Sequence, residues 1–303
     1  MYSFAQVFLA CLTLAQPPAP KVAVIIDDIG YQARLGEAAI DLPGPFAVAI
    51  MPFAPHSQRL ALLAEKSHKD VILHLPMEAQ SRNHLLGEGA ILASMSAEQM
   101  LTRLDSALAY VPQAIGVNNH MGSLLTSQRE PMDIIMAGLA ARQGLFFVDS
   151  KTSRRSIARA AASAAGVTAV ERHVFLDTEP LREEINVQLQ ELLNRAKKSG
   201  YALAIGHPYP ATLASLKAWR PTEVGVELVS IREYIEWVSA HSARIGNQRA
   251  RNAAKIAAAP SPPNNQTLTG KGPSNLEVST DTPFKTPAPI IRPTPTTAYD
   301  SRL

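Results

Sequence analysis

Short apolar runs rich in β-branched residues recur along this chain, and most are followed by a longer stretch whose apolar positions have helical spacing. Continuous apolar runs predict strands that are buried on both faces, and amphipathic stretches predict helices. The predicted strands are residues 22–26, 46–51, 71–75, 114–117, 145–148, 167–170, 202–205 and 224–229. The predicted helices are residues 57–67, 96–110, 131–143, 153–164, 180–199, 211–218 and 230–239.

This alternation of strands and helices over residues 21–245 indicates an α/β fold with a parallel sheet. The number of units fits a distorted (β/α) barrel of about seven parallel strands, and an open doubly wound sheet is the alternative. In both architectures ligands bind at the carboxyl ends of the strands. The residues that follow each predicted strand are therefore the first place to look for chemistry.

The two ends of the chain differ from this central part. Residues 4–15 are mostly apolar, which is shorter than the roughly 18–20 residues of a stable membrane span. We expect residues 1–20 to form a signal peptide or an apolar leader. A signal peptide implies a periplasmic or otherwise exported protein, whereas a leader without an export role implies no location. The single cysteine, Cys11, excludes a disulfide framework and a cysteine-based zinc site.

Residues 246–303 are rich in Pro, Thr and Asn, have few large apolar residues, and are predicted to be a disordered tail. This tail holds seven of the 29 basic residues and three of the 26 acidic ones, which leaves the rest of the chain at a net charge of −1. A nucleic-acid-binding domain needs a basic patch on its folded part, so we expect no nucleic-acid partner. The sequence gives no indication of the oligomeric state.

Acidic and histidine residues lie at the ends of five of the predicted strands or within a few residues after them. Because the carboxyl ends of parallel strands meet at one rim, we expect these side chains to converge, as in a catalytic site. They are Asp27, Asp28, His74, His120, Asp149 and His207.

One carboxylate and two imidazoles of this group form a candidate metal site. Asp28, His74 and His120 are a common set of three ligands for zinc, which leaves one coordination position for water. The alternatives are that the Asp27-Asp28 pair simply forms a turn and that each histidine is structural.

A second candidate is a group for proton transfer. His207 lies between Gly206 and Pro208, in a segment whose backbone is restricted, and a rigidly held imidazole suits a general acid or base. Asp149 could orient it, or could instead open the next helix with an Asx turn. Arg172 and Asp177 flank another strand-like piece and could contact substrate or pair with each other.

Several short segments together resemble the divergent polysaccharide deacetylase family over about residues 21–239, in matching order. They are residues 25–30 (IIDDIG), 74–78 (HLPME), 117–123 (VNNHMGS), 147–150 (FVDS), 174–177 (VFLD) and 204–208 (AIGHP). That family is similar to the metal-dependent carbohydrate deacetylases. The resemblance therefore implies a distorted (β/α) barrel and a divalent metal cofactor.

The resemblance also implies roles for individual residues. Asp27 would be the base, Asp28 and His74 metal ligands, and His207 the general acid, with Asp149 near the position that tunes it. Glu78 stands where the related enzymes carry a second histidine, so His120 would replace that ligand. An arginine of those enzymes that orients the base is missing. We assign substrate contacts to Asn119, Ser123 and Glu78.

Together these features predict a metal-dependent hydrolase, with zinc as the expected metal, that removes acetyl groups from a glycan of the bacterial envelope. The alternative is a non-catalytic protein on the same fold that binds glycans or organises the envelope. A glycoside hydrolase that uses Asp27 and Glu78 is less consistent with the sequence, because its chemistry needs no histidine cluster.

Overall fold

The computed structural model describes residues 18–241 and 251, which all fall within one compact unit, residues 1–254. The predicted leader lies almost wholly outside the described residues, and the predicted tail does so apart from residue 251. In the described part of the chain, no helix has the length and apolar character to cross a membrane.

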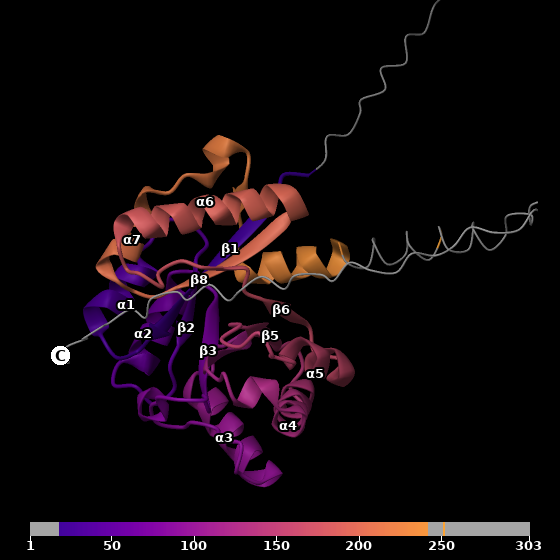
Figure 1. The fold of residues 1–303 in the computed structure, drawn as a ribbon. Helices are drawn as coiled ribbons and strands as arrows, with labels where there is room; N and C mark the ends of the chain where they lie inside the picture. The colour runs from indigo at the N-terminus through magenta and orange to yellow at the C-terminus, as the bar shows by residue number, and fades with distance from the viewer. Residues whose placement is uncertain (1–17, 242–250, 252–303) are drawn as a thin grey trace, which may run out of the picture. The chain divides into compact units, whose positions relative to one another are not determined.

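All strands of the sheet are parallel, and helices surround them (Figure 1). The strands are β1 (Lys21–Ile29), β2 (Ala47–Ile50), β3 (Val71–Met77), β4 (Gly116–Met121), β5 (Phe146–Asp149), β6 (Ala169–Glu171), β7 (Val174–Phe175), β8 (Tyr201–Gly206) and β9 (Glu227–Leu228). The α-helices are α1 (Ala33–Ile40), α2 (Ser57–Lys66), α3 (Ala97–Tyr110), α4 (Arg129–Ala140), α5 (Ala158–Ala165), α6 (Arg182–Ser199) and α7 (Pro210–Ala218). Residues 231–241 form a further helix.

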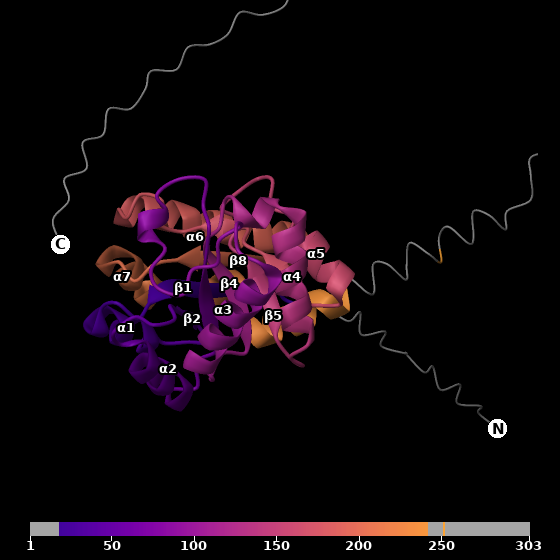
Figure 2. The ribbon, with the colours of Figure 1, turned by 90° about the horizontal axis from the view of Figure 1, so that it is seen from below.

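Eight strands follow one another in the order β6-β5-β4-β3-β2-β1-β8-β7, and β9 pairs with the start of β1. The sheet curls into a half-barrel with helices around it (Figure 2). This confirms the predicted deacetylase-like α/β fold. Its two end strands, β6 and β7, are separated in the chain only by Arg172 and His173. The Arg172 N–H donates to the carbonyl of Asp149, and the His173 N–H donates to that of Leu203.

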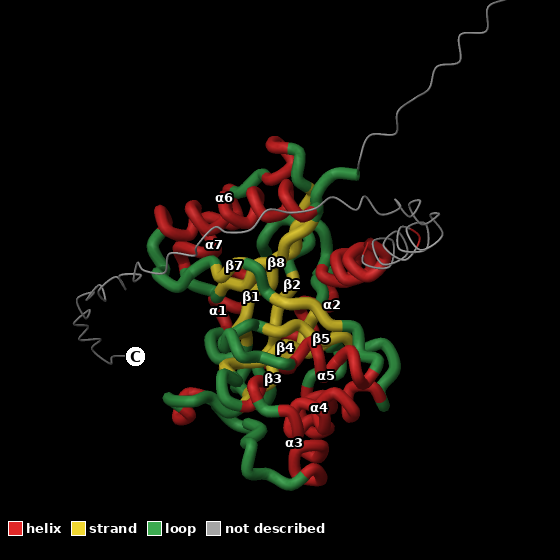
Figure 3. The backbone as a smooth tube through the Cα atoms, turned by 45° about the vertical axis from the view of Figure 1, so that its right-hand side comes forward, coloured by secondary structure: helices red, strands yellow, loops and turns green. Residues whose placement is uncertain are grey.

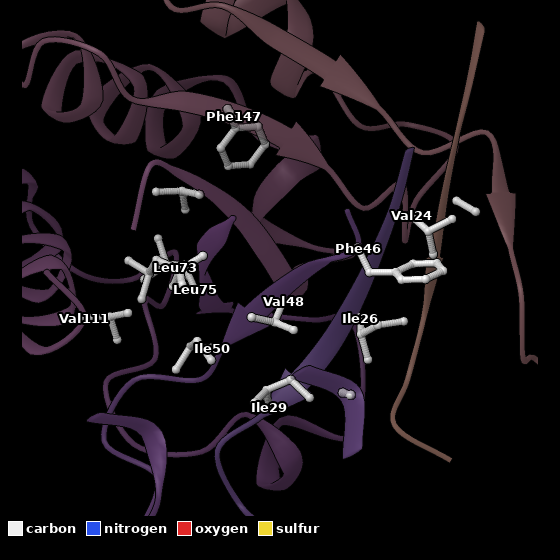
Figure 4. Close-up of a cluster of buried hydrophobic side chains, with 14 of the residues drawn as sticks. Val24, Ile26, Ile29, Phe46, Val48, Ile50, Leu73, Leu75, Val111 and Phe147 are labelled. Carbon is white, nitrogen blue, oxygen red and sulfur yellow. The ribbon is translucent and has the colours of Figure 1, made fainter. Parts of the chain in front are cut away.

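Side chains alternate between two hydrophobic clusters, one on each face of the sheet. Val22, Val24 and Ile26 of β1 pack in the larger cluster, which the helices α1–α7 cover; Figure 4 shows part of it. Ala23 and Ile25 pack in the smaller inner cluster, against the helix at residues 231–241. The continuous apolar strands of the sequence thus reflect burial on both faces.

The sheet positions the site because its strands end at a common rim, where loops gather (Figure 3). The inner-face residue after Ile25 is Asp27, and the inner-face residue after Ile72 is His74. Polar side chains therefore replace apolar ones where each strand approaches the rim.

Two helices differ most from the prediction. No helix is predicted for residues 33–40, where α1 lies. Gly36 lowers the helical signal there, but a Cβ at this position would come within 2.5 Å of Leu60 Cδ1 and would force that side chain to shift, so the close packing of α1 on α2 favours a glycine. Helix α5 begins at Ala158, later than predicted, because Ser153 and Ser156 form a hydrogen-bonded turn before it.

Candidate metal centre and active site

A bulge in β1 brings two adjacent carboxylates to the rim. Ile26 pairs with Val48 and Ile29 with Ile50, so β1 holds one residue more than β2 between these pairs. Asp28 adopts a left-handed conformation with φ of 58°. Successive strand residues normally point to opposite faces, but the extra residue and the turned backbone let both Asp27 and Asp28 face the candidate site.

The three candidate metal ligands lie together. One ligand atom from each of Asp28, His74 and His120 lies within 4.8 Å of the others. Asp28 Oδ1 is 3.2 Å from His74 Nε2 and 3.0 Å from His120 Nδ1, and the two imidazole nitrogens are 3.2 Å apart. Three separate strands supply these side chains, β1, β3 and β4.

This cluster fits a divalent cation. Asp28 Oδ1 is buried and receives no hydrogen bond of ordinary geometry from the described residues, and such an atom is costly unless something else binds it. Burial works to raise the pKa of Asp28, but the two imidazoles hold that pKa well below its usual range. Two imidazole nitrogens and one carboxylate are a donor set that suits zinc and leaves a position open.

Asn118 is fully buried beside the cluster and contacts both Asp27 and His74. Its Nδ2 donates to Asp27 Oδ1 at 2.8 Å, and its Oδ1 lies 2.8 Å from His74 Nδ1. An ionised carboxylate only accepts hydrogen bonds, so the amide oxygen faces His74 and Nδ1 carries a proton. In the neutral imidazole, the lone pair of Nε2 then points toward Asp28 and His120, as metal binding requires.

Asp27 lies deeper than Asp28, with 3% of its surface exposed. Its Oδ2 is 3.6 Å from His74 Nε2. Burial raises the pKa of the Asp27 carboxyl above its usual value, although the neighbouring imidazoles of His74 and His207 oppose this. A carboxylate of raised pKa is a better proton acceptor than an exposed one.

His207 reaches the same site from the loop after β8. Its Nε2 is 3.7 Å from Asp28 Oδ2, and its Nδ1 is 2.9 Å from Asp177 Oδ1. The other oxygen of Asp177 accepts hydrogen bonds from the His207 N–H and from Thr212 Oγ1. Burial works to lower the pKa of His207, but the hydrogen bond to Asp177 and the charge of Asp28 raise it to about 9.

The prediction that Asp149 orients His207 is wrong, since Asp177 occupies that place. The Asp149 carboxylate instead accepts hydrogen bonds from Ser156 Oγ and from the Lys151 N–H. Both bonds fix the loop that follows β5, which is the turn-forming role left open for Asp149. Asp177 does not pair with Arg172, whose guanidinium donates to the carbonyls of Ser150 and Lys151.

Asn119, for which a substrate contact is predicted, has its side-chain amide bonded to the backbone. Its side chain is buried, donates to the carbonyl of Met121 and accepts from the Ser150 N–H. Asn118, one residue earlier, faces the site. Alternation along β4 could have separated the two, because Val117 packs under the helices and Asn118 must point the opposite way.

Ser123 and Glu78 are half-buried and connect two loops at the rim. Ser123 Oγ accepts from the Gln80 N–H, and Glu78 Oε2 accepts from the Ala93 N–H. The backbone carbonyl of Glu78 accepts from the Leu124 and Leu125 N–H groups. These contacts hold the loop after β3, and Glu78 does not join the metal-ligand cluster.

The fold and the site together place the chain among α/β proteins in which a half-barrel of parallel strands carries a candidate cation site at its rim. The match to the family described as divergent polysaccharide deacetylase, over residues 24–235, identifies the chain more closely. The chain belongs to this family.

Its relatives include the uncharacterized protein YibQ of Escherichia coli K12, which is 37% identical over 211 residues. That alignment covers 69% of this chain and 66% of YibQ, so the chain spans just under two thirds of that relative. An uncharacterized protein of Haemophilus influenzae is 37% identical over 198 residues, which cover 65% of this chain and 70% of the relative. The crystal structure of an uncharacterized protein from Agrobacterium tumefaciens C58 has a similar fold, with a TM-score of 0.68, 23% identity, and coverage of 72% of this chain and 89% of that one.

Proposed function

We propose that this protein is a metal-dependent hydrolase that removes acetyl groups from an envelope polysaccharide or a related glycan. The observation that carries the proposal is the convergence of His74 and His120 on Asp28 Oδ1, a buried carboxylate oxygen that receives no hydrogen bond of ordinary geometry from the residues that the structure describes. Membership of the divergent polysaccharide deacetylase family supports the choice of reaction and substrate class.

Asp28, His74 and His120 would hold the cation, and zinc is the ion that their donor atoms favour. A bound divalent ion would polarise the acetyl carbonyl and lower the pKa of water toward about 7. Asn118 would keep His74 in the tautomer that offers Nε2.

The remaining polar residues would move protons. Asp27 would accept the proton of the attacking water, and Asn118 would fix the direction of its carboxylate. His207 would donate a proton from Nε2 to the leaving nitrogen or oxygen. Asp177 would hold the imidazole in position and stabilise its charged form.

The test measures metal content and acetate release on the same preparations. Purified wild-type protein is loaded with zinc and given acetylated glycans, among them oligomers of N-acetylglucosamine and acetylated xylan. We expect one zinc per chain and acetate release. His74→Ala and His120→Ala should lose both, and Asp27→Asn should keep the zinc and lose turnover.

The matched control is His68→Asn, an exposed histidine at the end of α2. Asparagine suits its φ of 55°, so this variant should retain zinc and activity. Zinc binding without acetate release from any acetylated glycan would contradict the hydrolase and favour a glycan-binding protein.

We also propose that the protein acts outside the cytoplasmic membrane, because an envelope glycan lies there. Fractionation of cells that produce the full chain should find it in the periplasmic or membrane fraction. Recovery in the cytoplasmic fraction alone would contradict this location.

A further inference from the structure

A cleft of about 210 Å³ lies beside the candidate active site, between the loops that follow β1 and β8. Asp28 and His207 form part of its lining, and Leu35 and Gly36 of α1 line it as well. A group that enters this cleft therefore contacts both a candidate metal ligand and the candidate general acid.

Two tyrosines line the cleft and are unusually exposed. Tyr31 has 47% of its surface exposed and Tyr209 has 43%, and they are the two aromatic residues among the exposed large hydrophobic side chains of the described chain. Both tyrosines have neighbours in the protein. The hydroxyl of Tyr31 lies against Gly87, where an added Cβ would come within 2.3 Å of Oη. The ring centre of Tyr209 is 5.7 Å from that of His207.

The lining combines apolar surface with groups that form hydrogen bonds. Tyrosine offers a flat apolar ring with a hydroxyl at its edge, and Gln32 adds an amide. A sugar ring has the complementary chemistry, with an apolar C–H face and hydroxyls around its rim. An acyl chain would satisfy only the apolar part and would desolvate the amide and hydroxyls without replacing their hydrogen bonds.

We propose that this cleft is a sugar-binding subsite, in which Tyr31 and Tyr209 contact one pyranose ring of the acetylated glycan. The inference rests on the proposed function, because it gives the substrate of that same site a position. It makes the two tyrosines specificity-determining residues that bind the sugar and take no part in proton transfer.

The test compares two substrates on zinc-loaded enzyme. Tri-N-acetylchitotriose carries sugar rings, and 4-nitrophenyl acetate carries the same acetyl group without one. Tyr31→Ala and Tyr209→Ala should raise KM for the sugar about tenfold, which is about 1.4 kcal/mol, and should leave kcat on the nitrophenyl ester within about twofold. Tyr31→Phe should retain most of the sugar affinity, since it keeps the ring.

The matched control is Leu62→Ala, which removes a similarly exposed apolar side chain from α2. This variant should change neither KM for the sugar nor kcat on the nitrophenyl ester. Unchanged KM in both tyrosine variants, or an equal loss on both substrates, would overturn the inference. So would a wild-type preference for 4-nitrophenyl hexanoate that the tyrosine variants lose, because the cleft would then hold an acyl chain.

Calorimetric titration with tri-N-acetylchitotriose separates this inference from the proposed function. Binding by the wild type that weakens about tenfold in the tyrosine variants supports the subsite even if no acetate is released. Release of acetate from an acetylated glycan, with the same KM in the wild type and in both tyrosine variants, overturns the subsite and leaves the hydrolase in place.

Discussion

Asp177 holds His207 at two points, with Oδ1 2.9 Å from the imidazole Nδ1 and Oδ2 2.6 Å from the backbone nitrogen. The carboxylate thus fixes both the ring and the backbone turn that presents it. Asp177 comes from the segment after β7, and His207 follows β8, so the pairing of these two strands creates the contact.

Asp177→Asn should therefore impair catalysis more than metal binding. The amide can neither stabilise a charged imidazole nor enforce one tautomer, so we expect kcat to fall by about 10² or more. Zinc content, measured by elemental analysis, should stay at the wild-type level. Thr212→Val removes only a third contact of the same carboxylate and should have a smaller effect. A kcat in Asp177→Asn equal to that of the wild type would contradict the proposed role of His207 as general acid.

Asn118→Leu should weaken zinc binding, although Asn118 is not itself a proposed ligand. The substitution frees His74 Nδ1 and Asp27 Oδ1 from their shared partner. Loss of a group that orients a ligand typically costs about 10–100-fold in metal affinity or activity. Competition with a fluorescent zinc chelator measures this. The control is Thr126→Val, which removes a buried hydroxyl that donates to the carbonyl of Gly122, and it should lower stability without changing zinc affinity.

Removal of zinc should destabilise the wild-type protein. A ligand that binds only the folded state at about 100 times its Kd adds about 2.7 kcal/mol, so thermal unfolding should shift to a lower temperature in the presence of a chelator. The unfolding temperature of His74→Ala should be the same with and without zinc. Magnesium should have little effect because imidazole nitrogens are poor ligands for it. A wild-type unfolding temperature that zinc does not move would argue against the site.

Glu171→Gln should reduce stability at neutral pH but not in acid. Burial works to raise the pKa of Glu171, but Lys151, at 2.8 Å from its carboxylate, and Arg159 lower that pKa below its usual value. A lowered folded-state pKa contributes stability above the unfolded-state pKa, and the contribution disappears as the pH falls through the folded-state value.

The difference in unfolding free energy between wild type and Glu171→Gln should accordingly be about 1 kcal/mol or less at pH 7, since the pair is partly exposed. It should approach zero near pH 2.5 (about two units below the ordinary glutamate pKa). Urea denaturation at the two pH values measures it. Glu65→Gln, on the exposed face of α2, is the control. A constant difference at both pH values would assign the effect to packing and not to charge.

The strands and the convergence of Asp28, His74 and His120 could be predicted because both follow from local rules. Strands buried on two faces are continuous apolar runs, and parallel strands present their carboxyl ends at one rim. The partner of His207 could not be found in this way. β7 is only two residues long and pairs with β8 rather than with β6, so nothing local indicates that Asp177 lies beside His207.

The roles of Asn118 and Asn119 depend on a single step of alternation. Both are polar and both follow Val117, so their composition does not separate them. Alternation from the buried Val117 and the pairing of His74 with Asn118 across β3 and β4 together decide which amide faces the carboxylates. The bulge at Asp27 and Asp28 is invisible to pattern analysis, since it depends on the register of β1 against β2.

The brevity of β6 and β7 has a consequence for how copies of this protein behave in concentrated solution. With three and two residues respectively, the outermost strands leave little unsatisfied backbone for another extended chain to join. A parallel sheet with long outer strands would be prone to stick to its neighbours. Here the shortness of the two outermost strands itself limits edge-to-edge association between copies.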